Sequence, residues 1–274
     1  LDAVQGDRFW YYSLKRRENG QLTPGTGTVR RFDDMCAEYV RTYHELEGLM
    51  ADDTGSRVLK NYIQYGEVLY GIGVPGACRG SVYIWSPGAM GQGFDEYLAA
   101  VRREPAAAAD FKLHDILQTV YTLVDCIKAM HTAGLLHLDI KPSNFLVHYD
   151  SDMKINGNRI SLFDINTLHR MGSGLPVLGG TVGYCAPEVL RGRADNRSDI
   201  YSVGAMLFEG IIISDNVPAG GFDPIHYESI PRLVRDSKLI RSSGSNSNVR
   251  LMSCLAGILQ KCLARNPRKR FQSC

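Results

Sequence analysis

Four side chains between residues 139 and 164 have the types and the order needed to handle a phosphoryl group. Asp139 is a carboxylate that could accept a hydrogen bond from an attacking hydroxyl, and Lys141 is a cation that could approach a moving phosphate. Asn144 and Asp164 offer an amide oxygen and a carboxylate oxygen, which are ligands that Mg²⁺ prefers. Phosphoryl transfer needs positioning and charge neutralisation more than covalent chemistry, so this set predicts such a reaction if the fold brings it together. A single aspartate or asparagine in a loop is commonly a turn former, so the inference depends on the whole pattern.

The pattern continues on both sides of these residues. The run from His137 to Asn144 reads His-Leu-Asp-Ile-Lys-Pro-Ser-Asn, and the run from Gly180 to Glu188 reads Gly-Thr-Val-Gly-Tyr-Cys-Ala-Pro-Glu. With Asp164 between them, the two runs resemble the catalytic loop, the metal-binding aspartate and the activation segment of the eukaryotic-type (Hanks-type) serine/threonine protein kinase family.

The resemblance is strong from 131 to 212 and from 262 to 271, and it implies both a fold and an activity. The implied fold is α+β and two-lobed, with a small mainly-β N-lobe that is incomplete at its start and a larger mainly-α C-lobe. The implied enzyme transfers the γ-phosphate of ATP, with Mg²⁺, to Ser or Thr hydroxyls of a protein substrate of unknown identity. Asp139 and Lys141 would be catalytic, and Asn144 and Asp164 would bind the metal.

The nucleotide-binding residues follow from the same resemblance. Lys15 would hold the ATP phosphates while paired with an acid on the following helix, either Glu38, which we favour, or Glu45. The backbone of residues 83–86, which include Ile84 and Trp85, would pair with adenine. The faces and inner end of the base pocket would be formed by Ser13, Leu146 and Phe163.

Five further residues at positions of the family template are expected to support the site rather than to take part in the reaction. Thr181 would hydrogen-bond to the catalytic aspartate and lysine, and Glu188 would form a buried ion pair with Arg270. Asp199 would fix the backbone of the catalytic loop. His137 has apolar neighbours and is expected to be a packed core histidine.

Two departures from the template bear on mechanism. Leu138 takes the place of the usual arginine, so no cation lies beside Asp139 to receive a phosphate, and we expect activity without phosphorylation of the activation segment. The triplet Asp164-Ile165-Asn166 replaces the usual Asp-Phe-Gly. Asparagine tolerates positive φ better than other non-glycine residues, so the turn can form.

Bulk composition is that of a globular protein. The chain has 274 residues, 44% of them hydrophobic and 22% charged, and a net charge of +2 gives no indication of nucleic acid as a partner. Seven cysteines without a Cys-x-x-Cys pair indicate a reducing, cytoplasmic compartment. No apolar run within the chain is long enough for a membrane segment.

The elements that must position the site divide into a strand-rich and a helix-rich part. Apolar periodicity and turn residues predict an N-lobe at 1–85, a hinge or linker at 86–93 and a C-lobe at 94–274. Residues 1–4 are expected to form the second strand of the template, so that the first strand and its glycine-rich loop would lie upstream. The further N-lobe predictions are a strand at 8–15, a loop at 19–27, a helix at 32–50, and strands near 62–70 and 80–85.

The C-lobe pattern predicts mostly helices. A wide apolar stripe marks 112–133, and a run that is apolar on most faces marks a buried helix at 199–212. Asn156-Gly157 is a hairpin-turn dipeptide between strands at 145–149 and 159–163. Helices are also expected at 94–103 and 249–264, with a connector at 242–248.

Two other classes of protein compete with an active protein kinase. A pseudokinase acting as a nucleotide-binding or scaffold module is favoured by the Asp-Ile-Asn triplet and opposed by the presence of every charged catalytic residue. A kinase of small molecules, such as aminoglycosides or choline, would lack the segment from Gly180 to Glu188, which this chain has.

Overall fold

The computed structural model describes residues 2–5, 10–18, 21–32, 67–69, 82–87, 91–150, 154–162, 167–173, 177, 179–244 and 249–274. The chain forms two compact units, Leu1–Met90 and Gly91–Cys274. Their boundary lies inside the segment predicted as a linker, and its role as a hinge between lobes stays a prediction. The predicted helix at 32–50 lies almost wholly outside the described residues.

The first unit contains an antiparallel sheet of five strands in the order β1-β2-β3-β5-β4. β1 (Asp2–Gln5) pairs antiparallel with β2 (Trp10–Glu18). β3 (Gln21–Phe32) pairs with β2 and with β5 (Val82–Pro87), and β4 (Glu67–Leu69) pairs with the other side of β5.

The predicted loop at 19–27 is wrong, because β3 already begins at Gln21. Pro24 pairs with Lys15, and the register between β2 and β3 shifts between Ser13 and Lys15. The glycines on either side of Thr26 lie opposite this irregularity, where a strand needs residues without a Cβ. The predicted linker also starts too early, because residues 86 and 87 continue β5.

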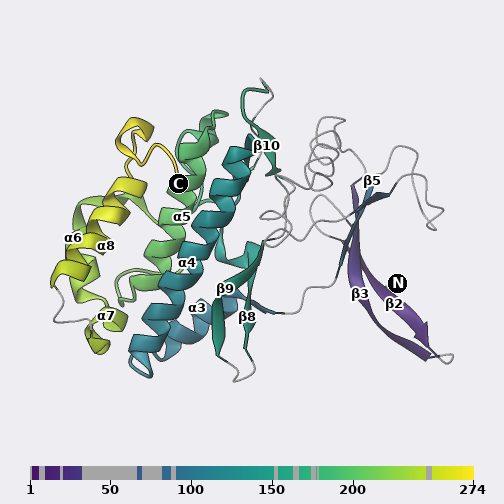
Figure 1. Ribbon diagram of the computed structural model, residues 1–274, viewed down its shortest axis with the longest axis horizontal. Coiled ribbons are helices and arrows are strands. Elements are labelled where there is room, and N and C mark those ends of the chain that lie inside the picture. Colours follow the sequence, from purple (N-terminus) through teal and green to yellow (C-terminus); the bar gives the residue numbers. More distant parts are fainter. Residues whose placement is uncertain are drawn as a thin grey trace. The chain divides into compact units, whose positions relative to one another are not determined.

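The second unit is built on two long helices. α4 (Ala109–Thr132) and α5 (Asn196–Ile211) lie side by side, and α5 also contacts α8 (Val249–Cys262), as Figure 1 shows. α5 begins at an Asp195 cap whose side chain accepts a hydrogen bond from the Arg197 N–H. Nearly every α5 side chain is buried, which confirms the buried helix predicted from its apolar run.

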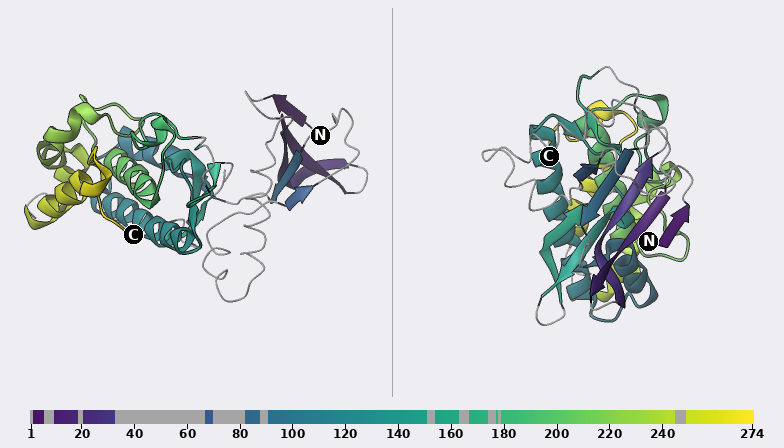
Figure 2. Two further views of the ribbon diagram at one scale, coloured as in Figure 1. Left: turned by 90° about the horizontal axis from the view of Figure 1, so that it is seen from above. Right: turned by 90° about the vertical axis from the view of Figure 1, so that its right-hand side faces the viewer.

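Smaller elements complete this unit. A three-stranded sheet has the order β6-β8-β9, and β7 pairs with β10. The β8–β9 hairpin lies against α4 (Figure 1 and Figure 2). The remaining elements are β6 (Gln92–Gly93), α3 (Phe94–Arg103), β7 (Leu135–Leu136), η1 (Pro142–Asn144), β8 (Phe145–Tyr149), β9 (Ile155–Leu162), β10 (His169–Arg170), η3 (Val189–Arg191), η4 (Pro224–Ser229), α6 (Ile230–Asp236), α7 (Lys238–Ser242) and η6 (Pro267–Lys269).

The prediction that Asn156-Gly157 forms the hairpin turn is wrong. Both residues lie within β9, and Asn156 pairs with His148. A Cβ on Gly157 would lie 2.8 Å from Gln118 Cγ, and the Gly157 carbonyl accepts a 2.6 Å hydrogen bond from Thr122 Oγ1. The glycine is therefore needed for close approach to α4 rather than for a turn.

None of the helices among the described residues combines the length and the apolar character needed to cross a membrane.

Candidate functional site

The loop from His137 to Asn144 connects β7 to β8, and one buried carboxylate fixes its start. Asp199, at the first turn of α5, has no exposed surface. Its Oδ2 accepts the His137 N–H at 3.0 Å and its Oδ1 accepts the Leu138 N–H at 2.8 Å. Nε2 of His131 lies 2.9 Å from Asp199 Oδ2. The predicted role of Asp199 in fixing the catalytic-loop backbone is confirmed.

Leu138 has a backbone conformation that is unfavourable for its residue type. Its φ is 64°, in the left-handed region that costs an L-residue roughly 1–2 kcal/mol. The side chain is 1% exposed, and the hydrogen bond to Asp199 holds the N–H. The position at which the template has an arginine is therefore held by a buried apolar side chain in a strained turn. His137 is fully buried, as predicted for a core residue.

Three polar side chains surround the carboxylate of Asp139. Thr181 Oγ1 donates to Oδ1 at 2.6 Å, Lys141 Nζ lies 2.9 Å from Oδ2, and Asn144 Nδ2 donates to Oδ2 at 3.0 Å. Lys141 also donates to Thr181 Oγ1 at 2.9 Å, and Asn144 Nδ2 donates to the Asp139 carbonyl at 2.8 Å. The structure thus brings together Asp139, Lys141 and Asn144, three of the four residues that were predicted to act together, and it confirms the predicted contacts of Thr181.

The environment of Asp139 favours its ionised form. Burial by itself would raise the pKa of this carboxyl group, but the hydrogen bonds from Thr181 and Lys141, the charge of Lys141 and the hydrogen bond from Asn144 outweigh it. The pKa of Asp139 therefore lies below its ordinary value. An ionised carboxylate at neutral pH is the form that can accept a proton.

The segment that follows Gly179 is attached at both ends. Near its start, the N–H groups of Tyr184 and Cys185 donate to the Thr181 carbonyl at 3.0 and 2.9 Å. At its end, Glu188 accepts two hydrogen bonds from Arg270, which is 2% exposed. The predicted ion pair is confirmed, and it fixes the segment to the C-terminal part of the chain.

The predicted nucleotide-binding residues are only partly described. Glu38, Phe163 and Asp164 lie outside the described residues, as does the alternative Glu45. Leu146 lies half-buried in β8, where it pairs with Gly93 and Ser161. The nucleotide-binding roles of all these residues stay predictions.

The other predicted nucleotide contacts lie in the sheet of the first unit. Ser13 and Lys15 belong to β2, while Ile84 and Trp85 belong to β5 and have strand partners on both sides. The kinase template carries its phosphate-binding lysine on the third strand, whereas Lys15 is on the second described strand. The third, β3, carries Arg30 and Arg31 and no lysine. Because residues 1–4 were predicted to be the template's second strand, β2 takes the place of its third strand, and the role of Lys15 stays a prediction.

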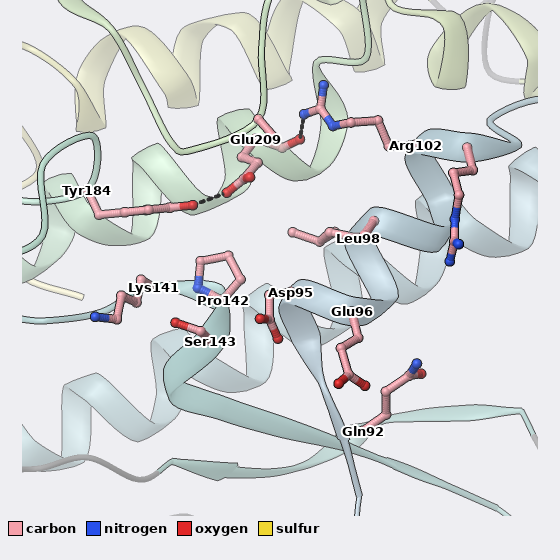
Figure 3. Close-up of a pocket in the computed structure, with 13 residues that line it drawn as sticks. Gln92, Asp95, Glu96, Leu98, Arg102, Lys141, Pro142, Ser143, Tyr184 and Glu209 are labelled. Atoms are coloured by element: carbon pink, nitrogen blue, oxygen red, sulfur yellow. Dashed lines mark hydrogen bonds between the residues drawn. The ribbon is translucent and has the colours of Figure 1, made fainter. Parts of the chain in front are cut away.

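A cavity of about 800 Å³ opens beside the catalytic loop within the second unit. Lys141, Pro142 and Ser143 form one wall of it, and residues of α3 form another (Figure 3). The other residues that line it are Gln92, Asp95, Glu96, Leu98, Ala99, Arg102, Arg103, Tyr184, Glu209 and Ala219.

The sequence analysis did not single out Tyr184 or Glu209 as residues of this site. The sequence did contain a signal for Glu209, because it is the one acidic residue within the apolar last two turns of α5. A charged residue retained in such a run indicates a specific partner.

Comparisons with known proteins agree with the fold. Residues 81–274 match the family described as "Protein kinase domain", and the chain belongs to this family. The crystal structure of the Mycobacterium tuberculosis PknI kinase domain has a TM-score of 0.58 and 19% identity, covering 99% of this chain and 89% of that one, which supports the two-lobed α+β fold.

Curated relatives are serine/threonine protein kinases. Serine/threonine-protein kinase PknL of M. tuberculosis is 33% identical over 39% of this chain, and PknJ of the same organism is 31% identical over 57%. Serine/threonine-protein kinase A of Synechocystis sp. is 29% identical over 51%. In each case the matched region spans 26% of the relative's own length. Membership of the family implies the use of ATP.

Proposed function

We propose that this chain is the catalytic domain of a serine/threonine protein kinase that moves the γ-phosphate of ATP to a Ser or Thr hydroxyl. The observation that carries the proposal is the convergence of Lys141, Asn144 and Thr181 on the ionised carboxylate of Asp139. The kinase relatives at about 30% identity support the same reading.

The hydrogen bonds of Asp139 leave room for a substrate. A carboxylate has about four acceptor positions. Within the described residues, Oδ2 accepts from Lys141 and Asn144, while Oδ1 accepts from Thr181 alone. The remaining lone pair of Oδ1 is therefore the position at which a substrate hydroxyl would donate its proton.

Lys141 also retains a donor. An ammonium group has three N–H bonds, and two of them are directed at Thr181 and Asp139. Among the described residues nothing accepts from the third N–H, which could therefore approach an oxygen of the γ-phosphate. As the substrate oxygen bonds to phosphorus, the bond from phosphorus to the β–γ bridging oxygen breaks, the hydroxyl proton passes to Asp139, and ADP leaves.

Of the two predicted magnesium ligands, Asn144 is the one that the structure describes. Asn144 turns its amide nitrogen toward Asp139, so its Oδ1 faces away and is available as an oxygen ligand. Together with Asp164, Asn144 would hold Mg²⁺, which neutralises phosphate charge when bound.

An Asp139→Asn variant tests the proposal. It should lose nearly all phosphotransfer to a generic protein substrate while keeping the melting temperature of the parent within a few degrees. Asp125→Asn, on α4, serves as the control and should retain activity. Equal turnover in Asp139→Asn and the parent would contradict the proposal.

A pseudokinase acting as a nucleotide-binding or scaffold module remains the second candidate, and the Asp164-Ile165-Asn166 triplet in place of Asp-Phe-Gly favours it. Replacement of Lys15 by Met and, separately, of Arg31 by Met should identify which residue supports ATP use. If ATP with Mg²⁺ raises the melting temperature of the parent but no phosphate is transferred, the chain is a nucleotide-binding module. If only the Arg31 variant lost activity, Arg31 of β3 rather than Lys15 would be the phosphate-binding residue.

A further inference from the structure

The charged residues of this chain are divided unevenly along its length. Residues 230–274 contain ten lysines or arginines and one acidic residue, Asp236, whereas the other 229 residues contain 21 basic and 28 acidic residues. The small net charge of +2 therefore conceals a strongly basic C-terminal portion. A surface that only has to stay soluble normally mixes both signs, and a surface of one sign is opposed by self-repulsion, so this portion fits an anionic partner.

The basic residues lie on elements that gather at one end of the second unit. α6 packs against α7 and α8, and Figures 1 and 2 both show the three helices together there. Nine of the ten cationic side chains are exposed, two each on α6, α7 and α8 and three at residues 265–269. The tenth, Arg270, is buried with Glu188. The nine exposed cations are called the basic end.

Carboxylates within the second unit neutralise little of the basic end. Asp236 lies 3.9 Å from Arg232 and 4.0 Å from Arg235, and Asp215, which is 83% exposed, pairs with Lys238. Such exposed ion pairs are weak and are screened by salt. The other cations of the basic end have no ion pair with a carboxylate among the described residues.

The outer face of α8 is the most uniform part of the basic end. Arg250, Cys254, Gly257 and Lys261 recur at helical spacing and are all exposed, while the opposite face of the helix is buried. No acidic residue belongs to α8. A Cβ on Gly257 would meet no atom within 4 Å, so nothing among the described residues covers this face.

Aliphatic side chains accompany the cations. Val249 and Ile258 of α8 are 72% and 40% exposed, and Ile225 of η4, which contacts α6, is 77% exposed. The large exposed aromatic side chains of the described residues belong instead to α4 and β8. Proteins that bind single-stranded nucleic acid stack bases on aromatic side chains, which the basic end lacks. Cations beside exposed aliphatic side chains are typical of proteins that lie on a membrane of anionic lipids.

We propose that the basic end binds the surface of an anionic lipid membrane. The cations meet the charged headgroups, and Val249 and Ile258 enter the boundary between headgroups and acyl chains. Each Lys or Arg near such a surface contributes about fivefold to the binding constant, and the attraction falls as salt shortens the screening length. The inference is independent of the proposed kinase function, because vesicle binding is measured without ATP or a substrate.

The test is flotation of the full chain with vesicles of phosphatidylcholine, either alone or with about one-third phosphatidylserine. Arg250→Gln combined with Lys261→Gln removes both cations from the outer face of α8. Lys154→Gln combined with Arg159→Gln is the matched control, because it removes the same charge from exposed positions of the β8–β9 hairpin, on the side of the unit away from α6 and α8 (Figure 1). Each variant is measured at about 0.1 M and about 0.5 M salt.

The parent should bind the anionic vesicles and not the neutral ones, and the higher salt should weaken the binding. The α8 pair should bind about 30-fold more weakly than the parent, and the control pair should differ from it by less than about twofold. All four positions are exposed, so the melting temperatures should match that of the parent. If the α8 pair does not fold, Arg265→Gln combined with Lys269→Gln takes its place, with the same expected loss.

A second variant tests the apolar contribution. Ile258→Ser should weaken binding to the anionic vesicles by about three- to tenfold, because part of the isoleucine surface enters the lipid. Leu190→Ser, at a 65% exposed position of η3, should bind as the parent does. An RNA or DNA duplex added at the same phosphate concentration should not displace the vesicles.

Four results would overturn the inference. The first is equal binding to neutral and anionic vesicles, or no binding to either, and the second is an equal loss in the α8 pair and the control pair. The third is unchanged binding in Ile258→Ser together with displacement by the duplex, which would assign the basic end to nucleic acid. The fourth is salt-sensitive self-association without lipid that the α8 pair abolishes, which would assign it to a second copy of this chain.

Discussion

Replacement of Thr181 by valine is the most direct test of the proposed catalytic cluster, which consists of Asp139, Lys141, Asn144 and Thr181. Valine keeps the shape of threonine but substitutes a methyl group for the hydroxyl. The change removes a 2.6 Å hydrogen bond to Asp139 and a 2.9 Å hydrogen bond from Lys141. Both bonds involve a charged partner, and the side chains of Asp139 and Lys141 are only 11% and 22% exposed.

The expected loss follows from these contacts. A hydrogen bond to a charged group contributes about 1.5–3 kcal/mol, and solvent screening is small at this exposure. If one such bond is needed in the transition state, kcat falls about 10- to 100-fold. The KM for ATP should change little, because Thr181 contacts the catalytic residues rather than the predicted nucleotide contacts.

The pH dependence should change in a defined direction. Burial raises the pKa of Asp139, and the hydrogen bond from Thr181 is the largest of the effects that lower it. Without that bond the pKa rises. Since the ionised carboxylate is the working form, activity is lost as pH falls through this pKa, and in the variant the loss begins at a higher pH.

The assay is steady-state phosphotransfer to a peptide at a series of pH values, with the parent and Thr132→Val measured alongside. Thr132 is exposed at the end of α4 and hydrogen-bonds only to the carbonyl of Lys128 among the contacts described, so its replacement should be neutral. If Thr181→Val and Thr132→Val gave the same kcat and the same acid limb, the hydroxyl at 181 would have no role in the cluster.

Two further predictions concern stability. Arg270→Met should lower the free energy of unfolding by about 3–5 kcal/mol, because it leaves the Glu188 carboxylate without its cation. The control Arg268→Met, at an exposed position, should leave stability unchanged. Urea unfolding followed by circular dichroism at 222 nm measures this, because every described helix lies in residues 91–274. Asp199→Asn should destabilise the same unit by about 1.5–3 kcal/mol and also reduce kcat, because His137 and Leu138 donate to different oxygens of Asp199 and the NH₂ group that replaces one of them cannot accept. Full kcat in the folded variant would show that the strained turn does not need the carboxylate.

Local sequence patterns predicted much of the second unit. α3 has the predicted bounds, and α4, α5 and α8 lie within about three residues of theirs, because apolar periodicity depends on neighbours within a few turns. The catalytic-loop run also predicted that Asp139, Lys141 and Asn144 act together. Because these three residues lie within six positions of one another in a tight loop, their side chains can hardly avoid lying close together.

Sequence rules failed where a distant partner decides the conformation. Pro24 and its neighbouring glycines have loop composition, yet pairing with β2 and β5 makes them part of a strand. Asn156-Gly157 has the composition of a turn, yet α4 uses the glycine for close contact. In both cases a gain in pairing or packing outweighs a weak local preference.

The sequence by itself determined the type of chemistry, because the residues able to hold a phosphate, a metal ion and a hydroxyl are present in a recognisable order. Only the tertiary structure decided which donors meet which acceptors. Asp199 of α5 accepts the N–H of Leu138 in its left-handed turn, and the Thr181 hydroxyl meets Asp139 across 42 residues of sequence. Hydrogen bonds between residues this far apart in the chain are set by how helices pack, and no local pattern encodes that packing.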